Sequence, residues 1–135
     1  MKELKSVFSR EELTENAVKL LKKLIATPSM SRDEYNVSLI IEGFFNEHHI
    51  VVNRFKNNIW ATNKHFDPAK PSILLNTHHD TVKPNKAYTL DPFIPVEKDG
   101  KLFGLGSNDA GASLVAMAQT FLYFYEAEDL AHNLI

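Results

Sequence analysis

Two short stretches of this 135-residue chain combine residue types that can bind a metal ion. In the first, His78 and Asp80 lie two positions apart, just after the apolar run 73–75, which is typical of a buried strand. The second, residues 104–109, contains two glycines and ends in Asp109, ahead of a long apolar segment. Side chains two positions apart on a strand share a face, and ligands bind where strands end in open α/β sheets. The sequence therefore predicts part of a metal site.

The three side chains suit different tasks at a metal. An imidazole such as that of His78 binds a metal through one nitrogen, and a nearby carboxylate such as Asp80 fixes its orientation. A carboxylate can also bridge two cations roughly 3.5–4 Å apart, and the start of a helix favours the negative charge of Asp109. The chain has no cysteine, so nitrogen and oxygen must hold any metal. This favours a hydrolytic zinc, manganese or cobalt site over a structural zinc site.

Simpler interpretations of the same residues stay open at this point. A lone His-x-Asp in a loop is most often a surface or capping arrangement, and Asp109 alone is most simply a helix N-cap. The glycines could begin a phosphate-binding loop, although the third glycine of the dinucleotide fingerprint and the Gly-Lys-Ser/Thr of a nucleotide loop are missing. Four other histidines lack patterned carboxylates and are expected to be solvated: His48, His49, His65 and His132.

Two amphipathic helices are predicted at the start of the chain. Ser9 and Glu12 fit a capping box ahead of an apolar stripe of helical period, which ends before Pro28. Ser31 and Glu34 repeat the capping pattern ahead of a second apolar stripe. These helices are expected to pack on the strands that follow.

The rest of the chain predicts strands and one buried helix. Hairpins are expected over residues 50–62 and 96–103, the second at an Asp-Gly turn. The central strand is expected over residues 72–77. Residues 110–128 are apolar on almost all sides, which is typical of a helix buried on a sheet. Residues 133–135 look like the start of another buried strand, so we expect the chain to be a fragment.

Composition narrows the class of protein. With 44% hydrophobic and 24% charged residues, the chain is an ordinary globular domain, long enough for one real core. Its formal net charge of −2 gives no electrostatic argument for nucleic acid or an anionic membrane as a partner. Residues 1–5 lack the apolar region of a signal peptide, and no run approaches a membrane span. We therefore expect a cytoplasmic protein.

Taken together, the motifs resemble a known family. The order is a strand, His78-His79-Asp80-Thr81-Val82-Lys83-Pro84, an Asp-Pro-Phe at residues 91–93, and a segment from the Asp-Gly turn at 99–100 to Asp109. This order resembles the zinc-dependent family of acetylornithine deacetylase, succinyl-diaminopimelate desuccinylase, aminoacylase and carboxypeptidase G. The resemblance covers residues 9–135 and looks closest to the acetylornithine deacetylase branch.

The resemblance implies an α/β fold: a three-layer zinc-aminopeptidase-like catalytic domain with a mixed sheet between helices, of which residues 1–135 are the N-terminal part. His78 resembles the terminal ligand of one metal, and Asp109 resembles the carboxylate that bridges both. Asp80 resembles the catalytic-site carboxylate that orients His78. The implied cofactor is zinc, two ions in the complete enzyme, with cobalt or manganese as alternatives. The Asp109–Ala110 peptide bond is expected to be cis.

The implied activity is hydrolysis of the amide of an N-acyl amino acid, as by an acetylornithine deacetylase in arginine synthesis. A related metallo-dipeptidase or succinyl-diaminopimelate desuccinylase is the alternative among hydrolases. A non-catalytic phosphate- or nucleotide-binding module is the alternative of another class. The family's general-base glutamate, its other ligands and the lid domain that forms a homodimer would follow residue 135. The chain alone is therefore expected to bind metal weakly and to be inactive.

The sequence also departs from the family pattern. Leu105 stands where the family has an arginine, Gly111 replaces a lysine, and Lys83 is inserted before Pro84. None of these is a ligand position, so the departures bear on the substrate side of the site.

Overall fold

The computed structural model describes residues 8–135. The expectation that residues 1–5 lack the apolar region of a signal peptide therefore lies outside the described residues. Three helices and six short strands follow one another, with one irregular turn of π type. Their order is α1 (Arg10–Ile25), α2 (Tyr35–Glu47), β1 (Asn53–Phe55), β2 (Asn58–Trp60), β3 (Ser72–Ile73), β4 (Val96–Lys98), β5 (Lys101–Phe103), η1 (Ser107–Ala112), α3 (Ser113–Phe124) and β6 (Asn133–Leu134). Within residues 8–135, no helix has the length and apolar composition that a membrane crossing requires.

Both predicted N-terminal helices are present, but only the first has the predicted cap. In α1 the Glu12 amide donates to the Ser9 hydroxyl (3.1 Å) and the Ser9 amide donates to the Glu12 carboxylate (2.8 Å). In α2 the N-cap position is Glu34, and no side chain caps the helix. The predicted capping role of Ser31 is therefore wrong, because its hydroxyl is hydrogen-bonded elsewhere.

The strands form three separate pairs. β1 and β2 are antiparallel, β4 and β5 are antiparallel, and β3 runs parallel to β6. Both predicted hairpins are confirmed, and the second turns at Asp99 and Gly100, which have φ angles of 52° and 70°. The helices and strands confirm the predicted α/β class, in which the strands form two antiparallel pairs and one parallel pair.

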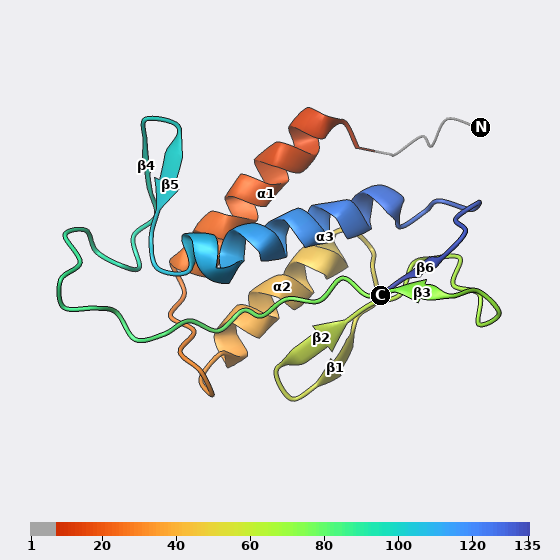
Figure 1. Cartoon of the computed structure of the whole chain (residues 1–135), viewed down its shortest axis with the longest axis horizontal. Helices are drawn as coiled ribbons and strands as arrows, with labels where there is room; N and C mark the ends of the chain where they lie inside the picture. The colour runs from red at the N-terminus through yellow and green to blue at the C-terminus, as the bar shows by residue number, and fades with distance from the viewer. Residues whose placement is uncertain (1–7) are drawn as a thin grey trace.

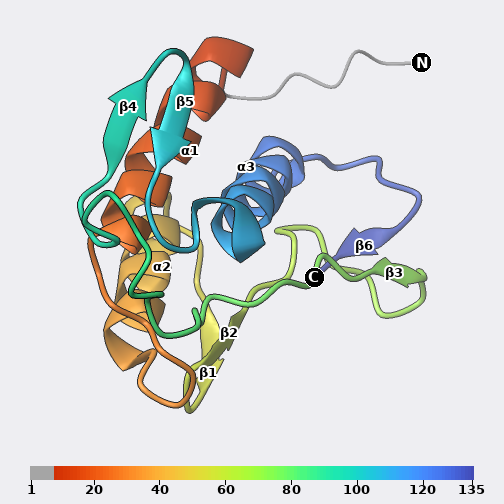
Figure 2. The same ribbon diagram turned by 60° about the vertical axis from the view of Figure 1, so that its left-hand side comes forward.

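The helices lie side by side, and the strand pairs surround them. Figures 1 and 2 show the β4–β5 hairpin beside α1 and the β1–β2 hairpin beside α2. An ion pair between Lys22 and Glu97 (2.7 Å) joins α1 to β4. The segment that follows β3 crosses the molecule in extended form (Figure 1). His78 and Asp80 lie on this extended segment.

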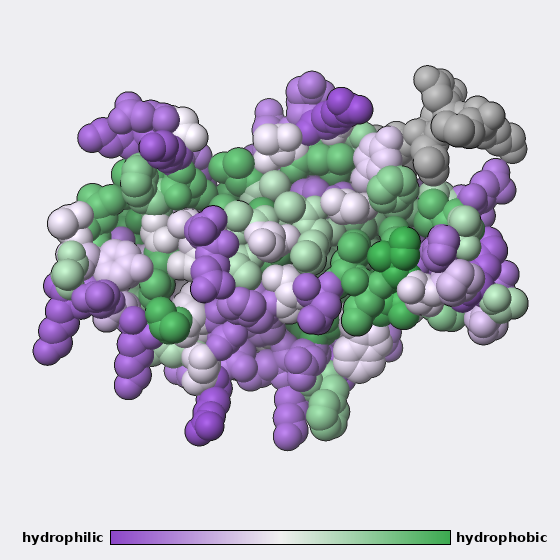
Figure 3. Space-filling view, in the orientation of Figure 1, coloured by the Kyte–Doolittle hydropathy of each residue, from purple (hydrophilic) through white to green (hydrophobic). Residues whose placement is uncertain are grey.

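The predicted central strand over residues 72–77 is shorter and more exposed than expected. Only Ser72 and Ile73 pair with β6 as a strand, and the Leu75 amide adds one hydrogen bond to the carbonyl of Ile135 (2.8 Å). Ile73 is 46% exposed and Leu74 is 66% exposed, so the prediction of a buried strand is wrong for this chain. The reason is that β6 is its one partner strand among residues 8–135. Figure 3 shows apolar surface on the face that the segment crosses.

The core lies between α1, α2 and α3. α3 begins at Ser113, later than the predicted residue 110, and it is buried on one side, with Ala116 and Thr120 exposed. The buried strand predicted at the end of the chain is confirmed, because Asn133 and Leu134 are 1% and 8% exposed. The apolar core is made by these buried side chains: Leu20, Leu21, Leu24, Ile25, Val37, Ile41, Phe44, Ile50, Ala61, Leu114, Val115, Ala118, Phe121, Leu122 and Leu134.

Candidate metal centre

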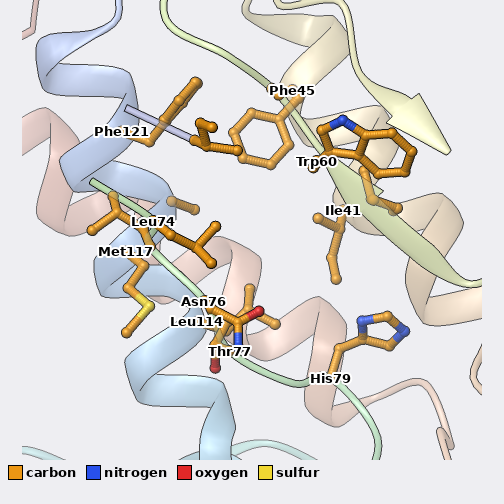
Figure 4. A pocket seen from close by; sticks show the side chains of 15 residues that line it. Ile41, Phe45, Trp60, Leu74, Asn76, Thr77, His79, Leu114, Met117 and Phe121 are labelled. Atoms are coloured by element: carbon orange, nitrogen blue, oxygen red, sulfur yellow. The ribbon is translucent and has the colours of Figure 1, made fainter. Parts of the chain in front are cut away.

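The extended segment after β3 contributes side chains to two different cavities. Thr77 and His79 line an apolar pocket between the segment and the helices, opposite the aromatic end formed by Phe45, Trp60 and Phe121 (Figure 4). His78 and Asp80 instead line a second cavity, of about 330 Å³, together with Asp109. From Thr77 to Asp80 this division follows the alternation of side chains along extended backbone.

Gly106 lets the loop before α3 approach the extended segment. Its φ angle is 75°, and a Cβ atom at this position would lie 2.7 Å from the methyl group of Thr81. Only glycine combines this backbone conformation with such a close approach at low cost. The loop then continues through Asp109, which has extended backbone angles (φ −113°, ψ 100°). The predicted cis bond between Asp109 and Ala110 is present.

The three predicted side chains converge, although His78 and Asp109 are 31 residues apart in sequence. His78 Nε2 lies 3.1 Å from Asp109 Oδ1, and His78 Nδ1 lies 3.2 Å from Asp80 Oδ1. The Asp80 backbone oxygen is also 3.2 Å from Nδ1. The side chain of Asp109 is 89% exposed and that of His78 is 54% exposed. Each ring nitrogen therefore faces a carboxylate, on the side of the cavity that is open to solvent.

Asp80 is held from its other side by Ser31. The Ser31 hydroxyl donates a hydrogen bond to Asp80 Oδ2, and the side chain of Asp80 is 35% exposed. This hydrogen bond is the main reason that the pKa of Asp80 lies below its ordinary value, with a smaller contribution from His78. A lowered pKa keeps the Asp80 carboxylate ionised, so that it can accept a hydrogen bond from an N–H group of His78.

The donor set fits a metal ion between His78 and Asp109. A neutral imidazole has one N–H and one lone pair, so donation from Nδ1 to Asp80 leaves the lone pair of Nε2 facing a carboxylate oxygen. Two acceptors in that arrangement need a proton or a cation between them. Zinc holds nitrogen and oxygen ligands at about 2.0–2.2 Å, so two ligands at a tetrahedral angle lie about 3.4 Å apart. The separation of 3.1 Å between His78 Nε2 and Asp109 Oδ1 is close to that value.

These donors are only part of a metal centre. Within residues 8–135, no group of three or more His, Cys, Asp or Glu side chains is arranged to hold a metal. Two candidate ligands, with Asp80 behind one of them, are therefore what the described chain offers.

The simpler interpretation of Asp109 as a helix N-cap is wrong. Its backbone is not helical, the N-cap position of α3 is Ala112, and no side chain caps that helix. The structure also disfavours a phosphate-binding loop at residues 104–108. A phosphate would need free backbone amides there, but the Leu105 amide donates to Pro92 (2.7 Å) and the Ser107 amide donates to Gly104 (3.2 Å).

The expectation that the other histidines are solvated fails at His48. Its ring packs edge-on against Phe44 at 4.8 Å and against Phe8 at 5.3 Å, measured between ring centroids. Burial lowers the pKa of His48, and burial likewise lowers the pKa of His79. His48 is thus half-buried at the end of α2 and lies outside both cavities.

Sequence reasoning missed two polar residues at this site. Ser31 touches Asp80 but comes from the loop between α1 and α2, where a serine is equally typical of a cap. Tyr88 lines the cavity beside Asp109 and lies in the long excursion after Asp80. No local pattern marks either residue, since both reach the site through the tertiary fold.

Comparison with known proteins finds relatives of the part of the chain that contains the candidate site. The sequence profile described as peptidase family M20/M25/M40 matches residues 74–134, which include all three predicted site residues. A succinyl-diaminopimelate desuccinylase of Bordetella petrii is 31% identical over 105 residues, covering 72% of this chain and 26% of that protein. One of Xylella fastidiosa is 34% identical over 113 residues, covering 76% of this chain and 29% of that protein.

The chain thus spans about a quarter of the length of these curated relatives. Their names support the family indicated by the motifs, whereas the closer likeness to acetylornithine deacetylase is not shown. The profile match covers the extended segment, the loop that carries Asp109, α3 and β6. Residues 74–134 of this chain are therefore similar to part of a peptidase family M20/M25/M40 domain.

Proposed function

We propose that this chain is the N-terminal part of a metal-dependent hydrolase that cleaves the amide bond of an N-acyl amino acid. The observation that carries the proposal is the pair His78 Nε2 and Asp109 Oδ1, 3.1 Å apart, with Asp80 at the other ring nitrogen. The match to peptidase family M20/M25/M40 over the same residues supports it. In this proposal residues 1–135 belong to one catalytic domain.

Each site residue has a distinct role in the proposal. His78 is the terminal ligand of one metal, Asp109 bridges two, and Asp80 is the carboxylate that orients His78. Zinc is the proposed metal, with cobalt or manganese as alternatives, because nitrogen and carboxylate donors suit all three. When bound, the metal supplies a water of lowered pKa and polarises the scissile carbonyl.

The protein's own groups prepare this chemistry. In the tautomer with the proton on Nδ1, His78 donates a hydrogen bond to Asp80, and the Nε2 lone pair is then directed at Asp109. The exposed Asp109 carboxylate places its Oδ1 atom 3.1 Å from that nitrogen. The cavity of about 330 Å³ beside them, lined also by Tyr88 and Ser107, offers room for an acyl group. We propose that a glutamate outside these residues relays the proton, so the chain alone is inactive.

The substrate is a small N-acyl amino acid. The names of the relatives favour a succinyl group, as in a succinyl-diaminopimelate desuccinylase. The motif resemblance favours an N-acetylornithine type of substrate, and a dipeptide is the third candidate. We further propose a cytoplasmic protein that forms a homodimer through a lid domain outside residues 1–135, with neither nucleic acid nor membrane as a partner.

Metal titration of the chain tests the site. We expect zinc or cobalt to bind weakly to the 135-residue chain, and His78→Ala or Asp109→Asn to abolish that binding. His132→Ala is the matched control, because it removes an exposed histidine remote from both cavities. Unchanged metal binding in His78→Ala and Asp109→Asn would show that the site assignment is wrong.

The reaction is tested on a longer protein that contains this chain. We expect turnover of N-succinyl-diaminopimelate or N-acetylornithine, lost in His78→Ala. Turnover of dipeptides alone would identify a dipeptidase, and turnover of no amide would contradict the proposed class of reaction.

A further inference from the structure

We propose that Ser31 is a positioning residue of the metal centre, whose hydroxyl fixes Asp80 and through it the imidazole of His78. The inference rests on the proposed function, in which His78 is a metal ligand. Ser31 lies 49 residues before Asp80, in the loop between α1 and α2, and outside residues 74–134 that match the family.

The loop around Ser31 is docked on the segment that carries the site. Met30 and Thr81 form a parallel β-bridge. The Thr81 amide donates to the Ser29 carbonyl (2.7 Å), and the Ser31 amide donates to the Thr81 carbonyl (3.3 Å). Ser29 is 3% exposed, so this junction lies against the protein interior. These backbone hydrogen bonds therefore hold the Ser31 hydroxyl next to Asp80.

The Ser31 hydroxyl and the His78 imidazole contact different oxygens of the Asp80 carboxylate. Ser31 donates to Oδ2, and Oδ1 lies 3.2 Å from His78 Nδ1. A carboxylate held at both oxygens cannot rotate about its Cβ–Cγ bond without breaking one contact. The Asp80 side chain is 35% exposed, so water would replace Ser31 if the hydroxyl were removed. The carboxylate would then lose its fixed orientation relative to the ring.

The orientation of Asp80 affects Nε2 of His78, the nitrogen that would bind the metal, because it influences which ring nitrogen carries the proton. When Asp80 accepts from Nδ1–H, the lone pair is on Nε2, which faces Asp109. Partners behind a ligating histidine typically change metal affinity or activity by about 10–100-fold when they are removed. Because Ser31 acts one step further away, we expect an effect of about tenfold.

A role as a helix cap does not account for Ser31. α2 begins at Tyr35 with Glu34 at its N-cap position, and no side chain caps it. The hydroxyl of Ser31 points instead to the site carboxylate.

The test compares Ser31→Val with Ser31→Thr in the 135-residue chain. Valine and threonine have nearly the same shape, so the two variants share any packing or folding effect and differ in the hydroxyl. Thr120→Val is a second control, because it removes a hydroxyl that donates to the Ala116 carbonyl (2.8 Å) on the exposed side of α3. Without metal, ¹⁵N spectra in slightly alkaline buffer report which ring nitrogen of His78 carries the proton.

We expect Ser31→Val to lower the affinity for cobalt about tenfold. We also expect it to reduce the Nδ1–H tautomer of His78 only in part, because the Asp80 backbone oxygen, also 3.2 Å from Nδ1, still favours that tautomer. Ser31→Thr and Thr120→Val should keep the tautomer and the affinity of the unaltered chain. The proposal is overturned if Ser31→Val matches Ser31→Thr in both measurements. Failure of the proposed function has another signature, since His78→Ala would then bind cobalt as tightly as the unaltered chain.

Discussion

Gly111 fixes the turn that presents Asp109, and we predict that a single methyl group there disrupts it. In Gly111→Ala the new Cβ atom would lie 2.4 Å from the Gly106 carbonyl oxygen and 2.6 Å from a methyl group of Leu21. The first distance is about 1 Å shorter than the 3.4 Å at which ordinary contact begins. The oxygen cannot retreat freely, because it accepts the Gly111 amide at 2.8 Å.

The cost follows from two effects. Overpacking in a well-packed interior costs about 1–3 kcal/mol, and weakening the Gly111–Gly106 hydrogen bond adds about 0.5–1.5 kcal/mol. We therefore expect Gly111→Ala to lower the free energy of unfolding by about 2–4 kcal/mol. Gly43→Ala is the matched control, since its Cβ would meet nothing within 4 Å inside α2. That change should stabilise the chain by about 0.5–1 kcal/mol.

Urea denaturation followed by circular dichroism measures both variants. The expected order of midpoints is Gly43→Ala, then the unaltered chain, then Gly111→Ala. A Gly111→Ala variant as stable as the unaltered chain would refute the close approach of Gly111 to Gly106, and with it the local geometry that places Asp109.

Three further changes test other parts of the structure. Ser9→Ala removes the capping box with Glu12 and should cost about 1 kcal/mol in urea denaturation; an unchanged midpoint would contradict the cap. Burial lowers the pKa of His48, so its contribution to stability is complete above about pH 6.5 and is lost as pH falls through the lower, folded-state pKa. His48→Gln should flatten this acid dependence in thermal melts, and an identical dependence would count against it. Asn133→Ala removes a 1% exposed amide that donates to the carbonyls of Asp67 and Lys70; we expect a loss of about 2–4 kcal/mol, and less than 1 kcal/mol would refute a structural role.

Local sequence signals predicted the elements that depend on local interactions. The Ser9–Glu12 capping box and the Asp99-Gly100 turn are formed by neighbouring residues, so their patterns sufficed. The start of α2 was predicted from the same kind of pattern, but Ser31 makes a contact 49 residues away instead. A local pattern cannot distinguish a serine that caps a helix from one that binds a distant carboxylate.

Burial of the central strand was a different kind of failure. The apolar run 73–75 predicts a strand, but burial depends on which strands and helices lie against it. Among the described residues only β6 pairs with β3, and Leu74 remains 66% exposed. The alternation of the segment was nevertheless predicted, and it places His78 and Asp80 on the same cavity.

The candidate site itself was partly accessible from the sequence. The two-residue spacing of His78 and Asp80 predicts a shared face, whereas the approach of Asp109 depends on the fold and was expected from the family resemblance. The contact of Ser31 with Asp80 was accessible from neither, because it depends on how the α1–α2 loop docks on Thr81.

The central claim is that His78 and Asp109 bind the same metal ion. Anomalous diffraction at the zinc edge, from crystals of the chain grown with zinc, tests it most directly. We predict one ordered zinc ion within about 2.0–2.2 Å of both His78 Nε2 and Asp109 Oδ1. Zinc bound elsewhere, with His78 Nε2 hydrogen-bonded to Asp109 and no metal between them, would contradict the claim.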